Sequence, residues 1–197
     1  VSSDADVAAL AALVMQAAGV PDLLVNNAYA RGVGRGGVDG IDLEAWRRAF
    51  DVNVFGYVRM HRAFVPHMAA RGGGHIVDTA SSLVIAPNPD VQVTLAYVAT
   101  KGAILGMGYG LRYSLHAKGL RYSVFCPGLT DTRPAGDARV TVHPQAAAPV
   151  SHAVAELLAG IERGDFLISS EPDFAATLLR MAQAKLDPLA LYGTKNG

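Results

Sequence analysis

Cysteine and charged residues are scarce in this sequence, and long apolar runs are missing. Its single cysteine, Cys126, excludes an internal disulfide framework and a cysteine-based zinc site. Charged residues make up 17% of the chain, and 17 basic residues balance 17 acidic ones, so no net charge favours nucleic acid or anionic lipid. No apolar run could span a bilayer, and the first residues lack the pattern of a signal peptide. We therefore expect a cytoplasmic protein that acts on small molecules.

Hydrophobic residues and glycine are plentiful instead. Hydrophobic residues make up 51% of the 197 positions, and 21 are glycine, which suits an α/β protein with closely packed helices. No internal repeat or linker divides the chain, so we treat residues 1–197 as one domain. The six histidines lack the spacing of metal ligands, and we predict no metal site.

Short apolar segments alternate with helix-forming segments along the chain. The predicted strands lie at 23–25, 75–82, 120–126 and 164–170. The predicted helices lie at 4–18, 42–68, 97–117, within 143–164, and at 171–186. Strands that are apolar on both faces and alternate with helices predict a parallel sheet covered by helices on each side.

Polar or turn-forming residues stand where the first three predicted strands end. In chain order these pairs are Asn26 and Asn27, Ser81 and Ser82, and Pro127 and Gly128. Ligands of such sheets bind at the carboxyl ends of the strands. The sequence therefore predicts a binding site at this edge.

Tyr97 and Lys101 lie four residues apart in a predicted helix, so their side chains share one face. A phenol with a pKa near about 10 is a poor proton shuttle at neutral pH, and a nearby ammonium lowers that pKa. We expect Ser81 to hold a substrate oxygen beside the phenol and Asn53 to position a water for proton exchange. None of these groups accepts a hydride, so the chemistry requires a redox cofactor.

A literal G-x-G-x-x-G pattern occurs at Gly32, Gly34 and Gly37. In a dinucleotide-binding motif the third glycine lies in the opening of a helix, whereas here residues 38–41 still precede the helix. We interpret this segment as a loop on the substrate side.

Five segments, in order, resemble the motifs of the short-chain dehydrogenase/reductase family. They are LVNNAYA at 24–30, DVNVFG at 51–56, HIVDTASS at 75–82, YVATKG at 97–102 and CPGLTDT at 126–132. The resemblance implies a Rossmann-like, doubly wound parallel sheet of the α/β class. It also implies an oxidoreductase that interconverts a ketone or aldehyde and an alcohol, with NAD or NADP as cofactor.

The resemblance implies roles for individual residues. Tyr97 would be the general acid/base, and Lys101 would lower its pKa and bind the nicotinamide ribose. Ser81 would orient the carbonyl, and Asn53 would support a proton relay. The implied cofactor contacts are Asn26, Asn27, Ala28, Tyr97, Lys101, Pro127, Gly128 and Thr132.

Two departures from the family pattern stand out. Tyr29 occupies the position of a glycine in the Asn-Asn-Ala-Gly motif, where a small residue lets the backbone approach the cofactor. The family also opens with a glycine-rich strand–turn–helix and two further strands that have no counterpart here. We therefore expect an N-terminally truncated fold without the first three strands.

Other readings remain open at this point. One alternative to an active enzyme is a truncated, non-catalytic dimerising homologue that no longer binds cofactor well. Another is epimerisation or dehydration on the same fold, although the chain lacks room for a larger substrate domain. Residues 132–149 and the C-terminal segment 178–186 are expected to shape the substrate pocket.

Helices equivalent to 42–68 and 97–117 form the dimer interface in many members of this family. The second helix also carries Gly102, Gly106 and Gly110 at intervals of four, which would let a helix or sheet approach closely. We predict a homodimer or homotetramer on the strength of the resemblance.

Overall fold

A four-stranded parallel sheet forms the centre of the computed structural model, which describes residues 1–30, 37–132 and 147–189. In spatial order the strands are β1 (Leu23–Asn26), β2 (His75–Thr79), β3 (Arg121–Cys126) and β6 (Leu167–Ser169). All neighbouring strands are parallel, and Asn26 of β1 lies opposite Asp78 of β2. The four predicted strands and their parallel arrangement are confirmed.

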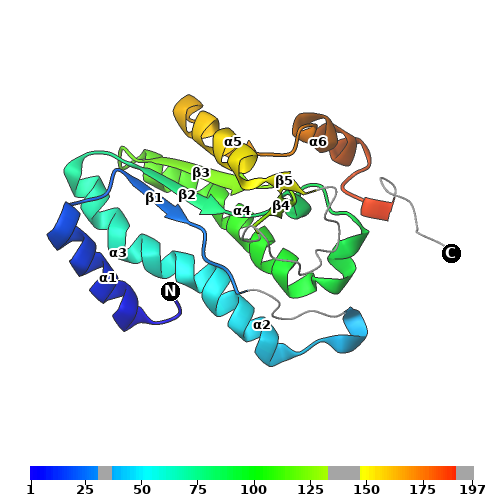
Figure 1. Ribbon diagram of the computed structural model, residues 1–197, viewed down its shortest axis with the longest axis horizontal. Helices are drawn as coiled ribbons and strands as arrows, with labels where there is room; N and C mark the ends of the chain where they lie inside the picture. The colour runs from blue at the N-terminus through cyan, green and yellow to red at the C-terminus, as the bar shows by residue number, and fades with distance from the viewer. Residues whose placement is uncertain (31–36, 133–146, 190–197) are drawn as a thin grey trace.

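Helices lie on both faces of this sheet, as the alternating pattern predicted, but one face of β1 is not covered by the described residues, because Leu23 and Val25 are exposed. The α-helices are α1 (Asp4–Ala18), α2 (Leu43–Phe50), α3 (Gly56–Arg71), α4 (Leu95–His116), α5 (Val150–Arg163) and α6 (Phe174–Gln183). In Figure 1, α5 lies on one side of the sheet, whereas α3 and α4 lie on the other, with α1 alongside α3. The described chain therefore has the predicted doubly wound α/β architecture.

Short elements connect the main ones. Three 3₁₀ turns cover Val38–Gly40, Ser82–Val84 and Pro89–Val93. A small parallel pair, β4 (Thr130–Asp131) and β5 (Ala148–Pro149), lies outside the main sheet.

The long helix predicted over 42–68 is divided in the structure. Asp42 caps α2, because its carboxylate accepts hydrogen bonds from the backbone N–H groups of Glu44 and Ala45. A π-helical turn over Asp51–Phe55 then separates α2 from α3. Pro66 does not end α3, which continues past Met68 to Arg71 and stops where Gly72 adopts a left-handed conformation, φ 90°.

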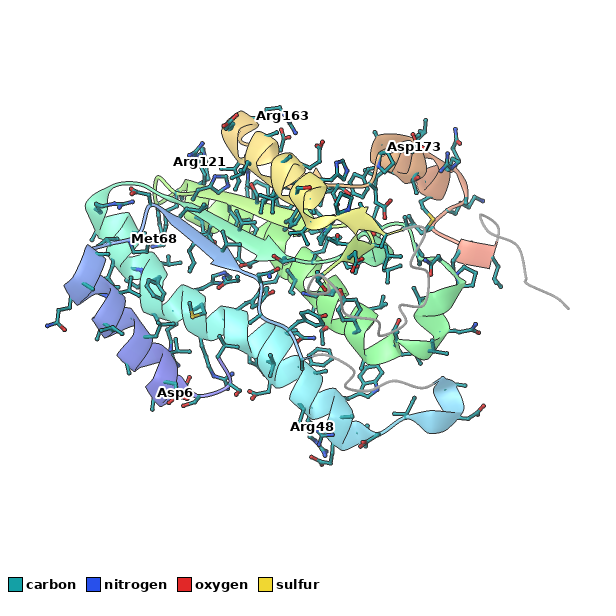
Figure 2. All side chains as sticks on the ribbon, in the orientation of Figure 1. Asp6, Arg48, Met68, Arg121, Arg163 and Asp173 are labelled. Carbon is teal, nitrogen blue, oxygen red and sulfur yellow. The ribbon has the colours of Figure 1, made fainter. Side chains whose placement is uncertain are left out.

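Apolar side chains fill both spaces between the helices and the sheet. The larger cluster joins α1, α3 and α4 to one face and includes Ala11, Tyr57, Phe64, Met68, Ile76, Ile104 and Val124. The smaller cluster joins α5 to the other face and includes Val77, Phe125, Ala153 and Ile168. Charged side chains such as Asp6, Arg48 and Arg163 lie at the periphery (Figure 2). No helix in the described part of the chain is long and apolar enough to cross a membrane.

The glycines of α4 divide between its two faces. A Cβ at Gly102, Gly106 or Gly110 would meet no other heavy atom of the described residues within 4 Å. A Cβ at Gly108 would instead lie 2.8 Å from Val124 Cγ2 of the sheet. Within the described chain, the close approach of α4 to the sheet therefore depends on Gly108 and not on the predicted glycine stripe.

Candidate active site

Ser81 lies just beyond the carboxyl end of β2. Hydrogen bonds from Ala80 N to Phe125 O (2.7 Å) and from Ser82 N to Pro127 O (3.0 Å) extend the contact between β2 and β3 on either side of it. The Ser81 hydroxyl also accepts a hydrogen bond from Leu83 N, 3.3 Å, at the start of the 3₁₀ turn. The backbone of the predicted serine is thus fixed at the sheet edge where ligands bind in this architecture.

Tyr97 and Lys101 lie in the first turns of α4, which begins two residues earlier than predicted. The Ser81 side chain is near enough to the Tyr97 hydroxyl to lower the pKa of that phenol. The Lys101 Nζ donates to Thr79 O of β2 at 2.6 Å and lies 5.8 Å from the centroid of the Tyr97 ring. The structure therefore brings together the three residues on which the sequence-based mechanism depends.

Burial dominates the proton affinities of these groups. It raises the pKa of Tyr97, an effect that the nearby Ser81 side chain opposes. It lowers the pKa of Lys101 to about 8, although the negative charge of Asp78 acts in the opposite direction. The expectation that the pKa of Tyr97 lies below its ordinary value is therefore not met in this structure, because desolvation of the phenolate outweighs the favourable contacts.

Asn53 is completely buried in the π-helical turn. Its Oδ1 accepts a hydrogen bond from Ala30 N at 2.7 Å, and its Nδ2 donates to Thr100 Oγ1 at 3.0 Å. The Thr100 hydroxyl in turn donates to Tyr97 O at 2.7 Å. The Asn53 side chain thus links the segment after β1 to the helix that carries Tyr97. The sequence predicted a proton relay for Asn53 but not this structural link.

Asn26 is a predicted cofactor contact. Its side chain belongs to a buried network on the face of the sheet that packs against α3. Its Nδ2 donates to Asp78 Oδ1 at 2.8 Å and lies 3.2 Å from His61 Nε2. The other carboxylate oxygen of Asp78 accepts a hydrogen bond from the Tyr122 hydroxyl at 2.8 Å. The structure therefore places the Asn26 amide among structural partners.

The remaining predicted cofactor residues directly follow β1, β3 and β4. Asn27 and Ala28 are exposed directly after β1, and Thr132 is exposed directly after β4. Pro127 and Gly128 follow β3, and Gly128 N donates to Ser170 Oγ at 3.0 Å. Two further expectations lie partly outside the described residues: the loop containing Gly32 and Gly34, and most of the predicted pocket segment 132–149.

Sequence reasoning did not single out three residues that surround this site. Thr79 lies at the end of β2, and its buried Oγ1 has no hydrogen-bond partner among the described residues. Glu171 accepts a hydrogen bond from Ser82 Oγ at 3.1 Å and lies so close to Gly128 that a Cβ there would be 2.5 Å from its carboxylate oxygen. No sequence motif marks Thr79, Thr100 or Glu171. The only indication in the sequence is that they lie close to Ser81, Tyr97 and the last predicted strand.

The described residues contain no group of three or more histidine, cysteine, aspartate or glutamate side chains that could hold a metal ion. Cys126 is fully buried, and burial raises the pKa of its thiol to about 12. It is therefore a core residue with little thiolate at neutral pH.

Comparison with known proteins agrees with this arrangement. A family model described as short chain dehydrogenase matches residues 1–142. The chain belongs to this family. Short-chain dehydrogenases have been solved that share its fold: one from Burkholderia cenocepacia, in complex with NADP, has a TM-score of 0.74 and 26% identity, over 94% of this chain and 75% of that one. Another, from Burkholderia phymatum in complex with NAD, has a TM-score of 0.76 and 25% identity, over 95% and 75%.

A curated relative in the short-chain dehydrogenase family is a 2-(R)-hydroxypropyl-CoM dehydrogenase from Xanthobacter autotrophicus. It is 36% identical over 135 residues, which cover 67% of this chain and 52% of the relative. The chain spans about half, or less, of the length of the curated relatives that it matches. The resemblance inferred from the five motifs is confirmed, as is the Rossmann-like fold.

Proposed function

We propose that the protein is an NAD(P)-dependent oxidoreductase that interconverts a ketone or aldehyde and an alcohol, with Tyr97 as its general acid/base. The observation that carries the proposal is that the Ser81 side chain acts on the Tyr97 hydroxyl, while the buried Lys101 ammonium lies 5.8 Å from the centroid of the Tyr97 ring. These groups come from two different elements, β2 and α4, and meet at the carboxyl edge of the sheet. The oxidoreductase names of the relatives support the same reaction class.

The three side chains have complementary parts in carbonyl reduction. The hydroxyl groups of Ser81 and Tyr97 both donate to the substrate oxygen, which orients the carbonyl and stabilises charge that develops on it. Tyr97 then transfers its proton to that oxygen. Because burial raises the pKa of Tyr97, this residue is protonated at neutral pH and ready to act as the acid. The positive charge of Lys101 stabilises the phenolate that remains.

A nicotinamide cofactor would supply or accept the hydride when bound. The residues present fit its nicotinamide end: the Lys101 N–H groups lie beside Thr79, whose hydroxyl has no hydrogen-bond partner among the described residues, and Asn27 is exposed directly after β1. NAD and NADP fit these residues equally well.

Adjacent serines provide a matched test of the proposal. The reduction of a panel of ketones and aldehydes by NADH and NADPH is measured for the wild-type protein, Ser81→Ala and Ser82→Ala. We expect Ser81→Ala to lower kcat by about 100-fold, because it removes a donor to the developing oxyanion. Ser82→Ala removes only the hydrogen bond to Glu171 and should stay within about threefold of wild type. Equal losses in both variants would contradict the role given to Ser81.

Self-association through α3 and α4 is part of the same proposal. The outer face of α4 is open at Gly102 and Gly106 among the described residues. Sedimentation analysis should show a dimer or tetramer, and Gly106→Arg should shift it toward the monomer. An unchanged mass for this variant would place the interface elsewhere.

A further inference from the structure

Three aromatic rings surround the Lys101 ammonium. The ring centroids of Tyr57, Tyr97 and Tyr29 lie 5.6, 5.8 and 5.9 Å from Lys101 Nζ. All three distances fall within the range in which a cation is attracted by the face of a ring. We call this set of three rings the aromatic enclosure.

The three rings come from separate parts of the fold. Tyr57 is fully buried at the start of α3 and donates a hydrogen bond to Thr79 O at 3.4 Å. Tyr97 lies one helical turn before Lys101 on α4. Tyr29 follows β1, is 44% exposed, and contacts the Tyr97 ring edge-on at 6.0 Å. Tyr29 is therefore the solvent-facing ring of the enclosure.

The aromatic enclosure stabilises the positive charge of Lys101 in a site where little water can reach it. Lys101 is only 2% exposed, so its ammonium has lost most of its hydration, and burial in this way disfavours the charged form. Thr79 O provides one strong hydrogen bond at 2.6 Å. The other titratable groups that act on Lys101 are Asp78 of β2 and Cys126 of β3, and the Cys126 thiol carries little charge at neutral pH because its pKa is about 12.

Ring faces stabilise an ammonium differently from a carboxylate. A carboxylate would take an N–H group into a fixed hydrogen bond, whereas a ring attracts the charge through its quadrupole and leaves that group available for a ligand. Such an environment suits a lysine that must remain charged in a dry site and still bind a hydroxyl of an incoming molecule. Tyr29 extends this environment on the side that faces solvent.

We propose that Tyr29 is a positioning residue for Lys101, whose ring completes the aromatic enclosure, stabilises the ammonium charge and holds it against Thr79 O. The enclosure stands on the geometry of the free protein. Its consequence for turnover rests on the proposed oxidoreductase function.

The test measures Lys101 directly, without cofactor or substrate. The sequence has four lysines, so ¹⁵N-labelled lysine gives few side-chain NMR signals, and Lys101→Arg identifies the one from position 101. Titrations follow this signal in the wild type, Tyr29→Phe, Tyr29→Leu and the surface control Tyr113→Leu. Leucine still excludes water but has no ring, whereas phenylalanine keeps the ring and loses only the hydroxyl.

We expect Tyr29→Leu to lower the pKa of Lys101 by about 0.5, a roughly threefold larger acid dissociation constant, because the charged form loses one ring. Tyr29→Phe and Tyr113→Leu should leave this pKa unchanged. An unchanged pKa in Tyr29→Leu would overturn the proposal, and so would an equal change in Tyr29→Phe, since the ring itself would then be irrelevant.

A second measurement separates this inference from the proposed function. If the protein reduces carbonyl compounds, the alkaline limit of its pH–rate profile should move down in Tyr29→Leu by the same amount as the pKa of Lys101, and Tyr29→Phe should restore it. If no reduction is detected, the NMR titration still decides whether Tyr29 acts on Lys101. Failure of the oxidoreductase proposal is thus distinguishable from failure of the enclosure.

Discussion

Two buried polar clusters meet on β2, and they differ in how their atoms are paired. In the inner cluster, both carboxylate oxygens of the fully buried Asp78 have protein partners: Asn26 and His61 on one, Tyr122 on the other. In the outer cluster at the strand end, the Lys101 ammonium has one backbone acceptor and three ring faces. Two adjacent residues of β2 therefore belong to different networks: Asp78 to one in which both carboxylate oxygens are paired, and Thr79 to one in which the Lys101 ammonium can still share its donors.

This difference indicates what each cluster is for. Buried polar groups are normally hydrogen-bonded, and a complete network fixes neighbouring elements in one arrangement. The inner cluster joins β1, β2, β3 and α3 in this way. Among the described residues, the Thr79 hydroxyl of the outer cluster has no hydrogen-bond partner and the Lys101 ammonium has one acceptor. These groups can therefore form further hydrogen bonds with a ligand. Substitutions in the two clusters should accordingly affect different properties.

The largest expected effect separates activity from stability. Tyr97→Phe removes the hydroxyl that transfers the proton but keeps the ring beside Lys101. We expect kcat for carbonyl reduction to fall by about 1000-fold, with the unfolding midpoint in urea nearly unchanged. Steady-state kinetics and urea unfolding, measured on the same preparations, check both parts. Retained activity would refute the assignment of Tyr97.

Asp78→Ala should produce the opposite result in the inner cluster. It leaves the buried donors of Asn26 and Tyr122 without an acceptor, so we expect the free energy of unfolding to fall by about 3 kcal/mol. The exposed Asp39→Ala serves as the control and should change it by less than about 0.5 kcal/mol. A loss below about 1 kcal/mol for Asp78→Ala would mean that the network is not a major source of stability.

A third pair of substitutions probes how closely α4 approaches the inner cluster. A Cβ at Gly108 would lie 2.8 Å from Val124 Cγ2 and 3.4 Å from the Tyr122 hydroxyl, so Gly108→Ala should cost about 2 kcal/mol of stability. Gly106 faces open space among the described residues, and Gly106→Ala should stabilise the helix by about 0.5 kcal/mol. Thermal unfolding of both variants tests the contrast, and a similar response would show that α4 can shift to make room.

The smallest expected effect concerns the pH dependence of the outer cluster. The pKa of Lys101 is lowered to about 8, so the ammonium is present below that pH and is lost as the pH rises through it. The reduction rate should therefore be flat near pH 6–7 and fall roughly fivefold between pH 8 and pH 9. In Lys101→Arg, whose guanidinium stays charged, the profile should lack this decline even if the rate is lower. A decline at the same pH in that variant would assign it to another group.

The main elements of the fold could be predicted because local patterns and tertiary packing agree there. In β3 the consecutive apolar residues Val124, Phe125 and Cys126 are all buried, and the helix at 4–18 ends at Gly19, whose φ of 78° favours glycine. The π-helical turn at Asp51–Phe55 could not be predicted, because its residues also fit an ordinary helix. Its position is linked instead to the contacts of Asn53 with Ala30 and Thr100, which are distant in sequence.

The candidate site shows the same limit. The motifs identified Ser81, Tyr97 and Lys101, which the structure brings together at one sheet edge. They did not reveal that the Asn26 amide would join Asp78, a partner 52 residues later, or that Tyr29 would lie over Lys101. The direction of the pKa change at Tyr97 also required the structure, because the extent of burial depends on how all surrounding elements pack.

The two hydrogen bonds of Asn53 have a consequence for how this sequence can diverge. One amide group joins the backbone at Ala30 to the hydroxyl of Thr100, which itself bonds to the carbonyl of Tyr97. A replacement at position 53 that loses the Nδ2 donor leaves the buried Thr100 hydroxyl without this donor unless position 100 changes with it. Over evolutionary time these two positions should therefore covary, and a double-mutant cycle between them should show strong non-additivity.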